Sequence, residues 1–293
     1  MIKLIAIISM LIDHTGMVLY PGLTIFGLPI LRVIGRIAMP LFAYSIAKGF
    51  YYTSDKTRYF MYMASFAAAS QIPFHQMRLA AGLTNISLNI MVTWLLAMIF
   101  LLGIERAIRM ERILWTEHSL NLKLDFGLKA KGIISAIFYL AFPIFFLKVI
   151  LAHFNITIDF GLYGIILPAL FYLPLYGMKV WKGEEYGGES LFAVKKDEEH
   201  KQSSPVAQAP KTLKKRKEEV LYSTVDYFIV LLLVAIATFW LWPRNSIQQY
   251  AVLAVFFIPL TIKFDRSIRL HKLFFYLFYP IHMIILVIIH NLI

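Results

Sequence analysis

The sequence predicts an all-α polytopic membrane protein with about nine transmembrane helices and a cytoplasmic N-terminus. Of the 293 residues, 59% are hydrophobic, and the mean hydropathy of +0.69 is far above that of a soluble domain. Apolar runs of about 18 residues, the length needed to cross roughly 30 Å of hydrocarbon, recur along the chain. Strand-like alternation of apolar and polar residues is absent, which favours helices over a membrane barrel.

Nine apolar segments are expected to span the membrane. In chain order they cover residues 4–19, 31–50, 59–74, 86–103, 133–152, 162–181, 225–242, 250–262 and 273–290. The first six form a membrane region at residues 1–181, with a cytoplasmic loop at 104–131. The last three form a second membrane region at residues 222–293.

The distribution of Lys and Arg predicts the orientation, because basic residues gather in the cytoplasmic loops of membrane proteins. With the N-terminus inside, 24 of the 29 basic residues fall on the cytoplasmic side and three on the outside, while Arg32 and Arg36 lie within the second segment. The net charge of +12 is therefore interpreted as a topology signal, and no nucleic acid is expected as a partner.

Two cytoplasmic loops differ in composition. The loop at 104–131 contains ERAIRMERILW, whose mixture of charged and apolar residues fits either a short helix on the membrane surface or a solvated connector. The loop at 182–221 is charged, contains Pro and Ser and is poor in apolar residues, which predicts disorder. Its basic residues could attract anionic headgroups, so membrane lipid is a candidate partner.

Polar residues inside the apolar segments are the candidate functional residues, because an ionised group at bilayer depth costs about 3 kcal/mol unless it is paired or faces water. Counting about 1.5 Å per helical residue places three of them near the midplane and three in the outer half. The first group is Asp13, His14 and His282, and the second is Arg32, Arg36 and Asn89. We expect these groups to meet in one cavity in the middle-to-outer membrane.

Asp13 is expected to pair with an arginine rather than with its neighbour. Adjacent helical residues point about 100° apart, so Asp13 is poorly placed to orient His14. Arg32 and Arg36 share a helix face, and either guanidinium could offer a fork of donors to the carboxylate. The same groups also fit a structural interpretation, in which an ion pair joins two helices and the histidines and Asn89 are hydrogen-bonded core residues.

Two prolines are expected to open the helices around these groups. Pro40 leaves the carbonyl of Arg36 without its usual helical hydrogen bond, and Pro280 does the same to Tyr276. Kinks at both positions would widen a pocket.

Five stretches carry motifs that belong together. They are MLIDHTG (10–16), LRVIGRIAMPLFAYSIAKGF (31–50), LNIMVTW (88–94), DFGLYG (159–164) and FFYLFYPIH (274–282). In this order they resemble the motif blocks of the TraX family of multi-pass membrane proteins. That family is named for a conjugation protein associated with N-terminal acetylation of pilin, and it is similar to the larger acyltransferase-3 group. The resemblance spans nearly all of the membrane portion, whereas the loop at 182–221 has no counterpart.

The resemblance implies a membrane-bound O- or N-acyltransferase in the cytoplasmic membrane of a bacterium. Acetyl-CoA would be the donor on the cytoplasmic side, and an amine or hydroxyl of a peptide or glycan would be the acceptor. A histidine near the end of the first helix is implicated in acyl transfer in the acyltransferase-3 group, and His14 stands at the matching place. It would act as base or as transient acyl carrier, supported by Asp13 and Arg36.

Further polar residues would bind the substrates, either at the developing oxyanion or at the outer mouth of the sixth segment. The expected substrate-binding residues are Arg32, Asn89, His282, Asp159 and Tyr163. No metal is expected, because no two His or acidic residues show a ligand spacing on one helix. The absence of cysteine excludes a cysteine thioester intermediate and any disulfide.

A proton-coupled secondary transporter or flippase is the alternative function. The intramembrane acid, arginine and histidines would then form a proton relay, and helices broken at Pro40, Pro168 and Pro280 would suit such a protein. The two halves of the chain show no matched pair of interrupted helices, which speaks against this alternative. A third interpretation is a non-catalytic assembly partner, in which the polar residues only join helices.

Overall fold

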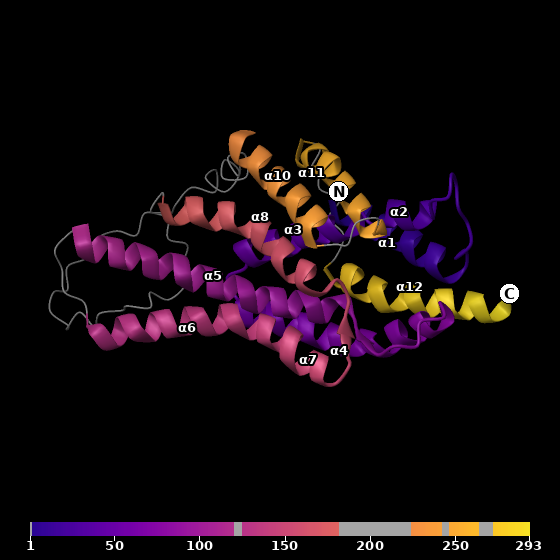
Figure 1. Ribbon diagram of the computed structural model, residues 1–293, viewed down its shortest axis with the longest axis horizontal. Coiled ribbons are helices and arrows are strands. Elements are labelled where there is room, and N and C mark those ends of the chain that lie inside the picture. The colour runs from indigo at the N-terminus through magenta and orange to yellow at the C-terminus, as the bar shows by residue number, and fades with distance from the viewer. Residues whose placement is uncertain (1, 120–124, 182–223, 242–245, 264–271) are drawn as a thin grey trace, which may run out of the picture.

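The structure, a computed structural model, describes residues 2–119, 125–181, 224–241, 246–263 and 272–293 (Figure 1). The helices are α1 (Ile2–Val18), α2 (Ile30–Gly35), α3 (Ala38–Tyr52), α4 (Lys56–Ala80), α5 (Ile90–Ser119), α6 (Phe126–Phe145), α7 (Leu151–His153), α8 (Gly161–Trp181), α10 (Thr224–Leu241), α11 (Ala254–Lys263) and α12 (Lys272–Leu292). A π-helical turn, η1 (Phe146–Ile150), joins α6 to α7, and a 3-10 helix, η2 (Ile247–Leu253), precedes α11. The predicted disordered loop at 182–221 lies outside the described residues.

Four stretches in the described part of the chain are helical, long and apolar enough to cross a membrane. They are Ile30–Tyr52, Ile90–Ser119, Phe126–His153 and Leu273–Leu292. Shorter apolar helices cover Gly161–Pro174, Leu231–Trp240 and Ile247–Ile258. Each of the nine predicted segments overlaps a helical part of the described chain, so the helical architecture is confirmed. The count of nine spans and the cytoplasmic N-terminus stay predictions.

Helix α1 lies within a bundle, where it packs against α2, α3 and α12 (Figure 1). Helix α4 packs against α12 and α5, and α8 packs against α3, α5 and α10. The side chains of Leu41, Ala43 and Ala47 on α3 are completely buried. The two alanines are small, so the backbones of neighbouring helices can approach closely. Such close packing stabilises helix pairs in a bilayer, where there is no hydrophobic driving force for their association.

The second predicted segment is broken into α2 and α3 at Arg36 and Ile37. Pro40 has no N–H to bond the carbonyl of Arg36, so the break lies where the sequence predicts a kink. Gly35 sits directly on Asp13 of α1 and leaves no room for a Cβ atom, so α2 approaches α1 closely at this break. By contrast, α12 continues through Pro280 as one helix.

The stretch ERAIRMERILW is part of α5, which differs from both predictions of a surface helix or a connector. Helix α5 has 30 residues, about 45 Å, and α6 begins at Phe126, so much of the predicted loop at 104–131 is helical. Gly103 packs against Leu140, and Gly132 packs against Met110. These glycines hold the long α5–α6 hairpin together, because a side chain at either position would separate the two helices.

Two short strands join the loops that precede α5 and α8. Strand β1 (Ser87–Leu88) pairs in parallel with β2 (Thr157–Ile158), with Ser87 opposite Thr157. The backbone N–H of Asp159 donates to the carbonyl of Leu88 at 3.0 Å. The pairing therefore fixes the position of Asp159, directly before α8.

Candidate functional site

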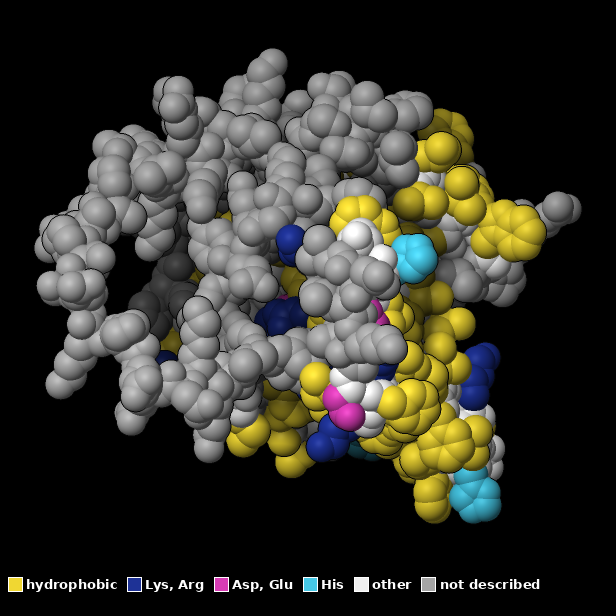
Figure 2. All heavy atoms as spheres, turned by 90° about the vertical axis from the view of Figure 1, so that its left-hand side faces the viewer, with side chains coloured by type: hydrophobic (Ala, Val, Ile, Leu, Met, Phe, Trp, Pro, Cys, Tyr) yellow, Lys and Arg dark blue, Asp and Glu magenta, His cyan; other side chains and the backbone are white. Residues whose placement is uncertain are grey.

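A cavity of about 790 Å³ runs between α1, α3, α4, α5 and α12. At one end its wall includes Lys3, Ser54 and Arg58, which are exposed on the side of the molecule predicted to be cytoplasmic. Figure 2 shows the molecule from that direction, with charged side chains lying among apolar ones. Farther in, the wall includes His14 and Arg36. One cavity thus connects exposed basic residues with the polar residues inside the bundle.

Aromatic side chains form much of the wall between these two ends. They are Phe42, Tyr52, Tyr59, Tyr62, Trp94, Phe160, Phe275, Tyr276 and Tyr279. Such a wall suits an elongated ligand that has apolar parts and a few polar groups. The sequence does not single out these residues, because an aromatic residue on an apolar helix is equally typical of the protein core and of a lipid-facing surface.

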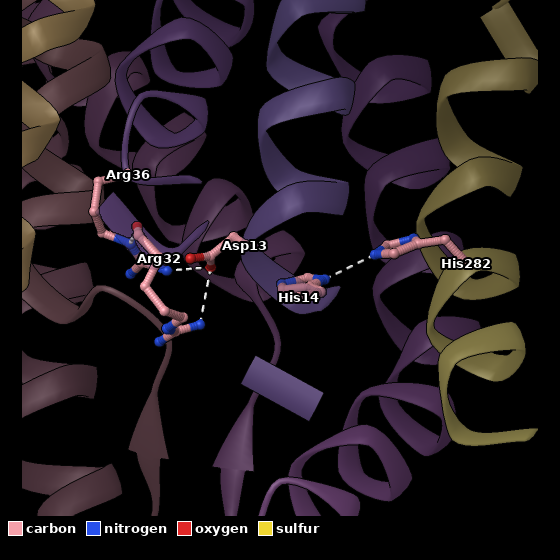
Figure 3. A network of polar contacts seen from close by, with 5 residues as sticks. All are labelled: Asp13, His14, Arg32, Arg36 and His282. Carbon is pink, nitrogen blue, oxygen red and sulfur yellow. Dashed lines mark hydrogen bonds and ion pairs between the residues drawn. The ribbon is translucent and has the colours of Figure 1, made fainter. Parts of the chain in front are cut away.

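Asp13 forms an ion cluster with both candidate arginines (Figure 3). Its Oδ2 atom accepts from Nη1 of Arg32 at 3.1 Å and from Nη2 of Arg36. Asp13 and Arg36 are only 7% and 4% exposed. Because neither charge is well hydrated, each is stabilised mainly by its ion pair with the other. The Oδ1 atom of Asp13 is buried and has no hydrogen-bond partner among the described residues. The predicted pairing of Asp13 with an arginine is present, and it involves both candidates.

His14 points away from Asp13 and toward α12, where it meets His282 (Figure 3). Nδ1 of His14 lies 2.7 Å from Nε2 of His282, and the two rings are almost parallel. Nδ1 of His282 in turn lies 2.7 Å from the carbonyl oxygen of Phe278. The structure therefore joins the two histidines that the sequence places at one depth, and it shows His282 in contact with the candidate catalytic residue.

The direction of these hydrogen bonds sets the proton positions on both rings. A carbonyl oxygen can only accept, so Nδ1 of His282 carries the proton and its Nε2 is an acceptor when the ring is neutral. His14 must then donate from Nδ1, which leaves the lone pair of a neutral His14 on Nε2. No hydrogen bond reaches this Nε2 atom within the described part of the chain. His14 can therefore act as a base or a nucleophile through that nitrogen.

Asp159 lies on the wall of the same cavity, at the start of α8. Burial raises the pKa of its carboxyl group to about 6, against the opposing influence of Arg36. The ring of Phe160 lies 5.8 Å from the guanidinium carbon of Arg36. Asp159 is therefore a second acidic group beside the ion cluster, as expected for a residue near the site.

Asn89 and Tyr163 are not brought to the cavity wall. The side-chain oxygen of Asn89 accepts from the N–H of Met91 at 3.0 Å, and its amide donates to the carbonyl of Ala67 at 2.7 Å. Asn89 thus caps α5 and ties it to α4. Tyr163 is 3% exposed, and its hydroxyl lies 3.0 Å from Oγ1 of Thr238. Both residues have structural contacts in place of the expected substrate contacts.

A second ion cluster, which sequence reasoning missed, lies where α4, α5 and α8 meet. Glu105 is 6% exposed, and its Oε2 accepts from Nζ of Lys56. Its Oε1 accepts from Nη2 of Arg109 at 2.9 Å, and Nε of Arg109 donates to the hydroxyl of Tyr176 at 2.7 Å. The four-residue spacing of Glu105 and Arg109 was the available signal, but the other partners are remote in sequence.

Apolar helices long enough to span a bilayer, with a cavity between them that is lined in part by charged and polar residues, define a multi-pass membrane protein with an internal site. The chain belongs to the TraX family, since the family model described as TraX protein matches residues 1–185. This match covers α1 to α8 and the whole cavity wall except the side chains from α12.

One relative is an uncharacterized protein of Rickettsia prowazekii (strain Madrid E). It is 42% identical to this chain over 76 residues, which is 26% of this chain and 28% of the relative. The likeness thus spans little more than a quarter of either protein. No solved structure matches this chain.

Proposed function

We propose that this protein is an integral-membrane acyltransferase, which moves an acetyl group from acetyl-CoA to an amine or hydroxyl of a peptide or glycan. The observation that carries the proposal is the place of His14. It lies on the wall of a cavity that opens among Lys3 and Arg58, and its Nδ1 is bonded to His282, which leaves Nε2 as the basic nitrogen. A half-buried base on the wall of such a cavity is suited to acyl transfer from a cytosolic thioester.

The donor would enter from the basic end of the cavity. Lys3 and Arg58 are exposed there and would attract the phosphates of acetyl-CoA. The aromatic wall would then accommodate the rest of the elongated donor, so that the thioester reaches His14.

In the reaction, Nε2 of His14 would take the proton of the acceptor as its nitrogen or oxygen attacks the thioester carbonyl. The new bond to the acyl carbon forms, the bond from that carbon to sulfur breaks, and the thiolate receives the proton from His14. In the other route, Nε2 itself first bonds the acyl carbon while the bond from that carbon to sulfur breaks and the thiolate leaves. The acceptor then attacks the acyl carbon, the bond to Nε2 breaks, and the proton of the acceptor passes through His14 to the thiolate. In either route, donation from Nδ1 to His282 supports the positive charge that develops on His14.

The Asp13 cluster would serve the oxyanion. Arg36 lies on the cavity wall and is held there by Asp13. Its guanidinium would be a positioned positive charge for the oxygen of the reacting carbonyl. A donor of this kind contributes about 3 kcal/mol in other acyl-transfer sites. Arg32 would act through Asp13, since it contacts the same oxygen.

The test uses the purified full chain, labelled acetyl-CoA and an acceptor mixture of lysate, peptides and surface glycans. The His14→Ala variant should lose about 10²- to 10⁴-fold of the label transferred to the acceptor, because it lacks the base. The matched control is His290→Ala on α12, an exposed histidine that should leave transfer unchanged. Unchanged transfer in His14→Ala, or no transfer by the native protein, would contradict the proposal.

The hydrogen-bond chain is tested separately from activity. Protein labelled with ¹⁵N-histidine should show the neutral ring of His14 protonated at Nδ1, whereas free histidine favours Nε2. The His282→Leu variant should shift His14 to the other tautomer and lower transfer. A His14 ring protonated at Nε2 in the native protein would refute the assigned tautomer.

A proton-coupled transporter remains the alternative, favoured by the helix break at Arg36 and Ile37 beside the cavity. It predicts that the protein, reconstituted in vesicles, carries protons with a solute and transfers no label. Label transfer that depends on His14, without proton movement, would exclude it.

A further inference from the structure

The link between α1 and α2 is a tight hairpin, here called the apolar hairpin and defined as residues 20–29. The N–H of Ile25 donates to the carbonyl of Leu28 at 2.9 Å, and the N–H of Leu28 donates back at 3.0 Å. Phe26 and Gly27 form the tip, with φ angles of +52° and +74°. Two successive left-handed residues are typical of the turn that matches the twist of a β-hairpin.

The surface of the apolar hairpin is exposed and carries no charge. Its exposed large side chains are Tyr20, Leu23, Ile25, Phe26 and Leu28, with Phe26 fully exposed. The sequence has no Asp, Glu, Lys or Arg from residue 19 to residue 31. Phe26 also holds a left-handed conformation that a bulky residue rarely adopts. An exposed apolar tip of this kind marks an interaction site, and the absence of charge indicates that its partner is also apolar.

The length of α1 places the apolar hairpin within the thickness of a bilayer. Helix α1 has 17 residues and is about 25 Å long, so it ends before crossing roughly 30 Å of hydrocarbon. Helix α12 reaches farther along the long axis of the molecule than this hairpin does (Figure 1). Toward that end, Ile285, Ile288 and Leu292 of α12 are apolar and exposed, as expected for side chains that meet lipid. The hairpin therefore lies at the depth of a lipid leaflet.

The backbone of the tip indicates the headgroup region rather than the centre of the bilayer. Among the described residues, the N–H groups of Phe26 and Gly27 donate no hydrogen bond to the protein. Such groups are costly in hydrocarbon and are satisfied where water and headgroups reach them. Tyr20, at the base of the hairpin, is of the residue type that gathers at this boundary.

We propose that the apolar hairpin inserts into the lipid leaflet at the C-terminal end of α1. Its backbone lies among the headgroups, and Leu23 and Phe26 extend into the acyl chains. The partner of this surface is phospholipid, and no second protein covers it. The proposal is independent of acyl transfer and of which side of the membrane this leaflet faces.

Single cysteines provide the test, because the native chain contains none. Phe26→Cys and Leu23→Cys are each labelled with a nitroxide in the full chain and reconstituted in vesicles of phosphatidylethanolamine and phosphatidylglycerol. The control is Thr84→Cys, an exposed polar position in the loop between α4 and β1. Spin relaxation then compares collisions with oxygen, which concentrates in hydrocarbon, and with a nickel chelate, which stays in water.

The ratio of oxygen to nickel collisions should be severalfold higher for the labels at Phe26 and Leu23 than for the label at Thr84. Equal ratios at all three positions would place the hairpin in water and overturn the proposal. Labels at Phe26 and Leu23 that are immobile and shielded from both reagents would also overturn it, because a protein would then cover the hairpin. Either hairpin position alone decides the question if the other variant fails to fold.

Discussion

Two buried carboxylates in this bundle each hold two cationic side chains, but they use their oxygens differently. Glu105 directs one oxygen to Lys56 and the other to Arg109, so both oxygens are satisfied. Asp13 directs a single oxygen to both Arg32 and Arg36, and its other oxygen is left without a partner among the described residues. We call these the complete cluster and the incomplete cluster.

The two clusters also differ in their position relative to the cavity. In the complete cluster every charge is used within the protein, and neither Glu105 nor Lys56 lies on the cavity wall. The incomplete cluster retains unused hydrogen-bonding capacity beside a cavity, next to His14, where stability alone would favour completion. We infer that the complete cluster fastens α4, α5 and α8, and that the incomplete cluster serves a ligand.

The largest expected effects come from neutralising each carboxylate. Asp13→Asn and Glu105→Gln should each lower the free energy of unfolding by about 3–5 kcal/mol, because each leaves buried cations unpaired. The clusters should differ in acyl transfer per folded molecule, which Asp13→Asn loses and Glu105→Gln keeps. Unfolding in detergent and label transfer, normalised to folded protein, measure the two quantities. Equal losses of transfer would remove the distinction.

Double substitutions sharpen the comparison. Adding Arg36→Met to Asp13→Asn, or Lys56→Met to Glu105→Gln, removes an unpaired charge and should restore part of the folded yield, with coupling energies of about 0.5–3 kcal/mol. Transfer per folded molecule should stay absent in the first pair and normal in the second. Additive effects on the unfolding free energy would refute the ion pairs.

A smaller effect is expected at the edge of the complete cluster. Tyr176→Phe removes the hydroxyl that accepts from Arg109 and should cost about 2 kcal/mol of unfolding free energy, as hydrogen bonds to charged groups do. Transfer should be unchanged, since Tyr176 does not line the cavity. A variant with native stability but lower transfer would show that the complete cluster also serves the site.

The smallest effect is expected at Asp159, beside the incomplete cluster. Because burial raises the pKa of this carboxyl to about 6, the folded protein holds its proton more tightly than the unfolded chain does. The associated stability is present at pH 4 and is lost as the pH rises through 6. Asp159→Asn should therefore stabilise the protein by about 1 kcal/mol at pH 8 and leave it unchanged at pH 4. Thermal unfolding of the native protein and of Asp159→Asn at pH 4 and pH 8 measures this difference. An equal effect of the substitution at both pH values would contradict the prediction.

The helices and the central polar residues were predictable because they depend on local pattern and depth. Apolar runs place the helices, and a constant rise per residue brings His14 and His282 to one level. Pro40 predicts the break before α3 because the missing N–H acts within one turn. The shared helix face of Arg32 and Arg36 predicts that either can pair with Asp13, and the structure shows both contacts.

The remaining features depend on contacts that sequence pattern does not encode. Asn89 caps α5 through Met91 and ties it to Ala67 of α4, and the hydroxyl of Tyr163 contacts Thr238, because of how neighbouring segments lie in space. The pairing of Glu105 with Lys56 joins residues 49 positions apart. The sequence predicted a surface helix or a connector for the charged end of α5, which the structure shows as part of one long helix. The sequence does not distinguish these cases, because a surface helix and the continuation of a membrane helix share one periodicity.

The pairing of β1 with β2 has a consequence for the geometry beside His14. Only two residues on each strand define their alignment, and Asp159 follows directly after the second strand. A slip by one position would displace its carboxyl group by about 3.3 Å and turn it toward the opposite face. The alignment of these four residues therefore determines whether the carboxyl group of Asp159 faces the cavity that His14 lines.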